Sequence, residues 1–152
     1  MVLLLMTILT FLADLLTKLL IRSNLYQGHA SLLGKYLQLT YVENRGAAFG
    51  IFQGRSLFLI LLPLLIIGFL LYFYRKEPRK SPILKIGTGL IIGGALGNLL
   101  DRVMLGYVVD FIQVDLVDFF QFPVFNVADI GVTLGTGFLL LFLLLESGKG
   151  ES

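Results

Sequence analysis

The stretch that decides the fold, residues 93–129, reads GGALGNLLDRVMLGYVVDFIQVDLVDFFQFPVFNVAD. Polar residues close one long apolar segment, an acidic segment without Lys or Arg follows, and a carboxylate opens the next apolar segment. The residues concerned are Asn98, Asp101, Arg102, Asp110 and Asp129. Carboxylates are costly to keep at the mouths of hydrophobic segments, so they are candidates for function.

The rest of the chain is strongly apolar. Of its 152 residues 57% are hydrophobic and only 14% are charged, which excludes an ordinary soluble fold. Four segments approach the length of about 20 residues that a membrane-spanning helix needs. They are residues 2–22, 56–74, 83–104 and 127–146. The sequence therefore predicts an all-α integral membrane protein with four transmembrane helices, formed as one domain over residues 1–152.

The composition also excludes several kinds of chemistry. The chain contains no cysteine, so disulfides, thiol catalysis and Cys-ligated metals are excluded, and we expect neither a metal nor a cofactor. The net charge of +2 comes from basic residues gathered in one loop and does not indicate nucleic-acid binding.

The first apolar segment is expected to be a retained helix and not a cleaved signal peptide. No basic residue precedes it, and it contains Asp14 and Lys18. On a helix Asp14, Thr17 and Lys18 share one face. Two compatible interpretations remain open: the charges neutralise each other where the helix leaves the membrane, with Lys18 reaching toward the interface, or they face a substrate.

Residues 23–55 form the first long loop. The alternation of residues 36–42 predicts a short strand. The segment NRGAAFG, which begins at Asn44, follows, and Gly46 permits tight backbone geometry there. Such a segment suits a place where an extended peptide lies against the backbone, or it is a plain turn after the strand.

The basic loop at residues 75–85 predicts the topology. It holds Arg75, Lys76, Arg79, Lys80 and Lys85. Short loops rich in Lys and Arg stay in the cytoplasm, so both chain ends are expected inside and loops 23–55 and 105–126 outside. The same basic residues could also contact anionic membrane lipids.

Small residues predict how the helices pack. Glycines recur at four-residue spacing in the third apolar segment and again in the fourth, at Gly89, Gly93, Gly97, Gly131 and Gly135. Such spacing lets transmembrane backbones approach closely, so the third and fourth helices are expected to pack tightly and bring their outer ends together.

The segment between these two helices is expected to place polar groups at the membrane boundary. Residues 111–122 are apolar with spaced acids and could lie along the interface as an amphipathic element. Asn126 could cap the fourth helix, and Asp129 lies near its positive end. The neighbouring Asp101 and Arg102 could simply compensate each other as an ion pair.

Asp110 and Asp129 are the candidates for catalysis. If the two carboxylates face each other, burial and repulsion leave them sharing one proton. One then acts as a base on water while the other polarises a carbonyl, as in aspartic proteases. A small transporter or proton channel remains the alternative, and a purely structural membrane subunit would leave both aspartates unexplained.

Five motifs in chain order resemble the bacterial lipoprotein signal peptidase family, also called signal peptidase II. They are DLLTK from Asp14, NRGAAFG from Asn44, GNLLDR from Gly97, GYVVDFI from Gly106 and FNVAD from Phe125. The resemblance extends from the first apolar segment to the last.

The resemblance implies a four-helix membrane aspartyl endopeptidase of the bacterial cytoplasmic membrane. Such enzymes remove the signal peptide of diacylglyceryl-modified prolipoproteins just before the lipidated cysteine. It implies catalysis by Asp110 and Asp129. It also implies substrate contacts at Asp14, Lys18, Asn44, Gly46, Asn98, Arg102 and Asn126. The family's outer β-cradle and short amphipathic outer helix would fall within residues 25–55.

Overall fold

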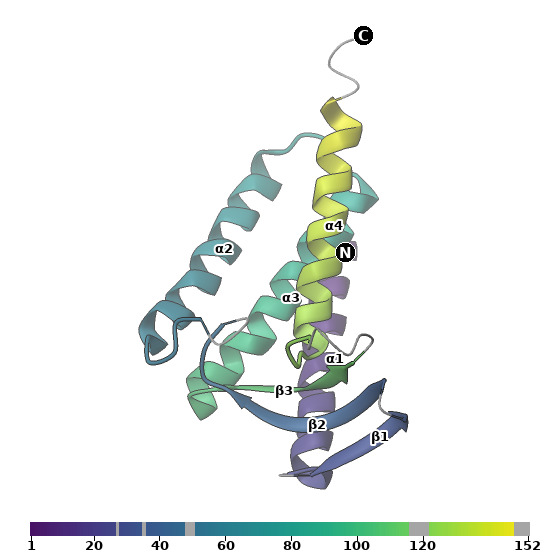
Figure 1. Cartoon of the computed structure of the whole chain (residues 1–152). Coiled ribbons are helices and arrows are strands. Elements are labelled where there is room, and N and C mark those ends of the chain that lie inside the picture. Colours follow the sequence, from purple (N-terminus) through teal and green to yellow (C-terminus); the bar gives the residue numbers. More distant parts are fainter. Residues whose placement is uncertain (27, 35, 48–50, 116–121, 148–152) are drawn as a thin grey trace.

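The computed structural model describes residues 1–26, 28–34, 36–47, 51–115 and 122–147. These residues form four helices and a three-stranded sheet at one end of the helix bundle (Figure 1). The helices are α1 (Val2–Asn24), α2 (Ser56–Lys76), α3 (Pro82–Leu105) and α4 (Val127–Ser147). All four are long and apolar enough to cross a membrane, which confirms the predicted fold class. Their ends differ from the predicted spans by at most two residues.

Local capping explains where α3 begins and ends. At its start the Ser81 hydroxyl accepts a hydrogen bond from the Leu84 backbone N–H at 3.2 Å, and Pro82 occupies the first turn. At its end Gly106 adopts a left-handed conformation with φ of 80°, which a glycine adopts without steric cost. The chain can therefore turn directly from α3 into the strand that carries Asp110.

Helix α3 lies at the centre of the bundle, and its glycines allow close packing against two helices, α1 and α4. A Cβ added at Gly89 or Gly93 would come within 2.7 Å or 2.6 Å of backbone oxygens of α1. A Cβ at Gly94 would come within 2.4 Å of the Ala128 oxygen of α4. Tight packing of α3 on α4 is confirmed, and α3 packs equally closely on α1 through Gly89 and Gly93. Spacing alone does not say which neighbour a stripe meets.

The sheet has the order β1-β2-β3 and is antiparallel throughout. Its strands are β1 (His29–Leu33), β2 (Leu37–Asn44) and β3 (Val108–Val114). The cradle was expected within residues 25–55, but its third strand comes from the segment after α3. Residues 111–114 are therefore strand and not part of an amphipathic interfacial element, while residues 116–121 lie outside the described residues.

Loop 23–55 otherwise contains less helix than the resemblance implied. In its described part, which omits residues 27, 35 and 48–50, the expected short outer helix does not appear. Ala48, Phe49 and Gly50 of the NRGAAFG motif lie outside the described residues.

Two features bring β3 and the start of α4 together. The Phe125 carbonyl accepts hydrogen bonds from the Phe111 and Ile112 N–H groups at 3.0 and 2.8 Å, and the Phe125 N–H donates to the Ile112 carbonyl. The segment that precedes α4 thus runs against β3, so that Asp110 and Asn126 become neighbours.

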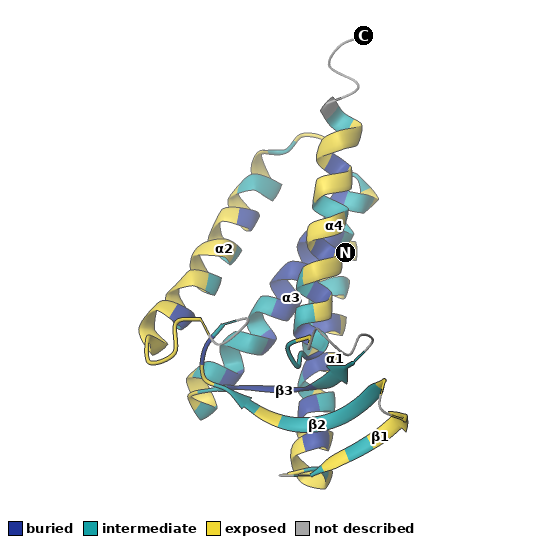
Figure 2. Cartoon of the chain, viewed as in Figure 1, coloured by how far each residue is buried: buried dark blue, intermediate teal, exposed yellow. Residues whose placement is uncertain are grey.

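Helix α2 stands apart from α4 and packs mainly on α3 (Figure 1). Figure 2 shows that most of its surface is exposed. Its buried residues are Leu59 and Leu70. In a membrane this exposed apolar surface contacts lipid. The separation leaves a groove beside α3, described below.

Candidate active site

Asp110 lies on β3, with 2% of its surface exposed. Its two carboxylate oxygens accept hydrogen bonds from the side-chain amides of Asn126 at 2.7 Å and Asn44 at 2.8 Å. Burial raises the pKa of Asp110 to about 6, and the negative charge of Asp129 adds to the effect, while both amide donors oppose it. Asp110 is therefore a carboxyl group that can hold a proton at a mildly acidic pH.

Asp129 lies in the first turn of α4 and forms a reciprocal cap with Asn126. The Asn126 side-chain oxygen accepts from the Asp129 N–H at 2.9 Å, and an Asp129 carboxylate oxygen accepts from the Asn126 N–H at 3.1 Å. The predicted cap by Asn126 is confirmed. The other carboxylate oxygen of Asp129 accepts from the Asn98 amide at 2.8 Å. The cap and this amide hold the carboxylate in one orientation.

Asn126 joins the two aspartates. It is fully buried, and its single amide group donates to Asp110 and also to the Asn98 oxygen at 3.0 Å. The same side chain therefore caps α4, next to Asp129, and positions Asp110.

A buried ionic cluster lies behind these residues. The Lys18 ammonium is 2.7 Å from an Asp14 carboxylate oxygen and 3.1 Å from an Asp101 oxygen. Neutralisation of Asp14 by Lys18 is confirmed, but Lys18 is only 2% exposed and does not reach toward the interface. The predicted Asp101–Arg102 pair is wrong, because Asp101 contacts Lys18 and accepts from the Val109 N–H at 3.0 Å.

The cluster also fixes the helix ends. The second Asp14 oxygen accepts from the Ala128 N–H of α4 at 2.8 Å. Gly97 permits the approach of α1, since a Cβ there would lie 2.4 Å from an Asp14 oxygen. Through these contacts one cluster connects α1, α3, β3 and α4.

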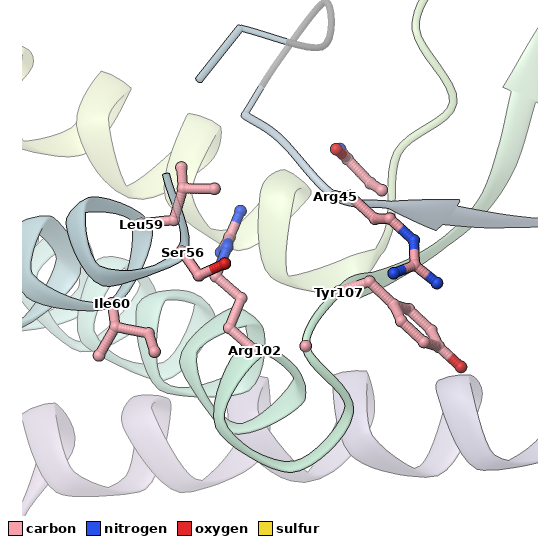
Figure 3. A pocket seen from close by; sticks show the side chains of 8 residues that line it. Arg45, Ser56, Leu59, Ile60, Arg102 and Tyr107 are labelled. Atoms are coloured by element: carbon pink, nitrogen blue, oxygen red, sulfur yellow. The ribbon is translucent and has the colours of Figure 1, made fainter. Parts of the chain in front are cut away.

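Arg102 points away from this cluster, toward the loop after β2 and the start of α2. Its guanidinium donates to the Gly46 carbonyl at 3.1 Å and to the Asn98 carbonyl at 3.4 Å. Figure 3 shows it beside Ser56 in a small pocket of about 10 Å³, where Arg45 lies over the Tyr107 ring. Space of this size suits a single water molecule. The contact with Gly46 ties the NRGAAFG segment to the end of α3.

A groove of about 740 Å³ leads to the aspartates. Its walls are mainly apolar side chains of α2, α3 and α4 together with the segment before α4. Its polar residues are Asn44, Asn98, Arg102, Asp110, Asp129 and Thr133. Apolar walls with a few convergent polar groups are typical of a binding site for a largely apolar ligand.

The structure brings some predicted site residues to this groove and keeps others behind it. Asn44, Asn98, Arg102, Asp110 and Asp129 line it, whereas Asp14, Lys18, Gly46 and Asn126 do not. Sequence reasoning missed the apolar lining residues, such as Leu62, Ile66 and Phe125, because apolar residues in a membrane helix carry no signal that separates a groove from a lipid-facing surface.

The arrangement supplies acid and base groups but no evident cation site. Within the described ranges, no three His, Cys, Asp or Glu side chains are grouped as a metal ligand set. The chemistry these residues can perform is proton transfer between a paired acid and base, at the polar end of an apolar groove.

Fold and site together define a polytopic membrane protein with two aspartates, the buried Asp110 and the half-buried Asp129, at the end of a groove between its helices. Comparison with known families assigns it further. The family profile described as signal peptidase (SPase) II matches residues 6–145, and the chain belongs to this family. It is accordingly an aspartic peptidase of the bacterial membrane, which confirms the resemblance seen in the motifs.

Individual relatives agree with this assignment. The chain is 44% identical to a lipoprotein signal peptidase of Clostridium novyi over 88% of this chain and 90% of the relative. It is 42% identical to that of Halothermothrix orenii over 95% of this chain and 96% of the relative. A bacterial membrane enzyme solved by the in meso method superposes with a TM-score of 0.87 at 31% identity, covering 95% of this chain and 88% of the other.

Proposed function

We propose that this peptidase removes signal peptides from diacylglyceryl-modified prolipoproteins, cuts just before the lipidated cysteine, and uses Asp110 and Asp129 as its catalytic pair. The observation that carries the proposal is the position of both carboxylates at the polar end of a long apolar groove. A signal peptide is an apolar segment whose cleavage site lies near the membrane surface, and the diacylglyceryl group would hold the scissile bond at that depth.

The two aspartates take different roles in this proposal. Asp110, whose pKa burial raises to about 6, holds the proton and donates it to the oxygen of the scissile carbonyl. Asp129 takes a proton from the attacking water. When the carbon–nitrogen bond then breaks, the leaving amine receives the proton that Asp129 took, and a hydroxyl of the tetrahedral intermediate returns a proton to Asp110 as the carbonyl forms again.

The polar groove residues bind the substrate backbone. Asn44, Asn98 and Arg102 line the groove beside the aspartates and offer amide and guanidinium donors. Gly46 contributes its backbone rather than a side chain, because its carbonyl holds Arg102 in place. The remaining polar residues do not line the groove and instead hold its lining residues in place. They are Asp14, Lys18 and Asn126.

The orientation in the membrane follows from the charges. The basic residues between α2 and α3 lie at the end of the bundle opposite the sheet (Figure 1). We place this end in the cytoplasm and the sheet, with the aspartates, at the outer face.

The deciding experiment is cleavage of a diacylglyceryl-modified precursor by purified protein. Asp110→Asn and Asp129→Asn should each abolish cleavage and leave the protein folded, because an amide cannot alternate between proton donor and base. Asp115→Asn is the matched control, since Asp115 lies in the same acidic segment and accepts a hydrogen bond from Gln113 instead of lining the groove. Near-wild-type turnover by either Asn variant at 110 or 129 would contradict the proposal. Ion flux in liposomes without cleavage would favour the transporter alternative.

A further inference from the structure

The Lys18 ammonium is surrounded by acceptors of the protein itself. It donates to the side-chain oxygen of Asn98 at 2.9 Å and forms ion pairs with a carboxylate oxygen of Asp14 at 2.7 Å and one of Asp101 at 3.1 Å. Its positive charge is therefore compensated within the cluster. With 2% of its surface exposed and no place in the groove lining, Lys18 acts on neighbouring residues and not on the substrate.

The contact with Asn98 decides which way that amide faces. An ammonium group only donates, so the Asn98 atom beside it must be the oxygen. The Asn98 nitrogen is thereby turned to Asp129, 2.8 Å away. In the opposite orientation an amide oxygen would face the Asp129 carboxylate and an amide nitrogen would face the ammonium, and both contacts would be repulsive.

The orientation of Asn98 also determines the orientation of the Asn126 amide, which contacts Asp110. The Asn98 oxygen also accepts from the Asn126 amide at 3.0 Å, so the Asn126 nitrogen must face it. The Asp129 N–H donates to the Asn126 oxygen and fixes the same orientation from the other side. With that orientation the Asn126 nitrogen donates to Asp110 at 2.7 Å.

We propose that Lys18 is a positioning residue that orients the Asn98 amide and, through it, directs one amide donor at Asp129 and another at Asp110. This inference rests on the proposed function, because it assigns how the proposed catalytic pair is held. It changes the role implied by the family resemblance, in which Lys18 contacts the substrate.

The test must separate hydrogen-bond orientation from the loss of a buried charge. Lys18→Met alone would leave Asp14 and Asp101 facing each other without a cation. The Asp14→Asn/Lys18→Met double variant is therefore compared both with the wild type, whose cluster has the same net charge, and with Asp14→Asn alone. The readouts are kcat and KM for a lipidated precursor and thermal unfolding in detergent.

On the Asp14→Asn background Lys18→Met should lower kcat by about tenfold, the effect expected for one misdirected buried hydrogen bond, with KM changed by less than about twofold. When Asn98→Ala is also present, the cost of Lys18→Met should fall to nearly nothing, because the residue through which Lys18 acts is gone.

Two outcomes would overturn the inference while leaving the proposed function intact. One is an unchanged kcat for Lys18→Met. The other is a decrease in kcat on Lys18→Met that is the same whether position 98 is Asn or Ala. Should the Met variant unfold, Lys18→Gln gives the same comparison, since its shorter side chain also ends the ammonium contact. Failure of the wild-type chain to cleave the precursor would instead overturn the proposed function, and this inference with it.

Discussion

Asn126 offers the sharpest test of the site, because two of its roles can be separated by the choice of substitution. The side-chain oxygen caps α4 by accepting from the Asp129 N–H at 2.9 Å, and the nitrogen donates to Asp110 at 2.7 Å. Serine is a good N-cap but lacks the amide donor, whereas alanine lacks both functions. Asn126→Ser and Asn126→Ala thus differ in the cap alone.

The contacts of Asn126 set the changes expected in stability and in the pKa of Asp110. Loss of the cap costs about 1 kcal/mol, so the Ala variant should be less stable than the Ser variant by that amount. Both variants remove a buried hydrogen bond to a carboxylate, worth roughly 1.5–3 kcal/mol when the carboxylate is charged. Because that bond opposes the effect of burial on Asp110, its loss should raise the pKa of Asp110 above about 6.

The sign of the pH effect follows from the proposed role of Asp110 as proton donor. The donor is lost when Asp110 ionises, so this ionisation sets the alkaline limb of kcat/KM in the free enzyme. In Asn126→Ser and Asn126→Ala this limb should move to higher pH, and by the same amount in both.

The assay is cleavage of a lipidated precursor in detergent between about pH 4 and 9, with unfolding followed in the same buffers. A shift of the alkaline limb to lower pH in either variant would refute the assignment of Asp110 as the acid. Equal stability of the Ser and Ala variants would refute the capping role.

Four further predictions follow. Gly97→Ala should lower stability and activity because its Cβ would lie 2.4 Å from an Asp14 oxygen. Gly68→Ala on α2 is the control and should be tolerated, because a Cβ there would have nothing within 4 Å. Equal thermal unfolding temperatures of the two variants would contradict this prediction. Asp115→Asn should retain activity. The sequence predicts the same for Asp118→Asn, although position 118 lies outside the described residues. Loss of cleavage in either variant would place the acidic segment in the site. Single cysteines introduced at Ser81 and Asp115 of this cysteine-free chain should report opposite sides of the membrane, so that an impermeant thiol reagent applied to intact cells labels only the one at 115, and the reverse pattern would invert the topology. Chelators should leave cleavage unchanged, and loss of activity with EDTA that a divalent metal restores would count against a mechanism based on aspartates alone.

Much of the fold was predictable because the membrane imposes simple length and polarity rules. The four apolar segments gave the helices to within two residues, and the Asn126 cap followed from its position before an apolar segment. The strand at residues 108–114 was not predictable in the same way. Its second half belongs to residues 111–122, whose apolar residues with spaced acids also fit an amphipathic interfacial segment, and only the pairing of the strand with β2 decides between the two.

The local sequence could not predict which residues pair with one another in the site. Asp101 and Arg102 are adjacent in sequence, yet Asp101 contacts Lys18 of α1 and Arg102 contacts the Gly46 carbonyl. Successive residues of a helix point about 100° apart, so neighbours in sequence are poorly placed to pair. The glycine spacing of α3 likewise does not say which helix each glycine meets, since a central helix has several neighbours and the spacing fits each of them.

The exposed apolar surface of α2 has a consequence for how the enzyme distinguishes its substrate. In a bilayer, acyl chains would cover this surface and the groove beside it when no peptide is bound. An apolar peptide that enters the groove would then only exchange one hydrocarbon neighbour for another. No water is released from apolar surface in that exchange, so the hydrophobic effect contributes little to affinity. Discrimination between a precursor and any other membrane helix must then come from shape and from the few polar contacts where the groove ends, next to Asp110 and Asp129.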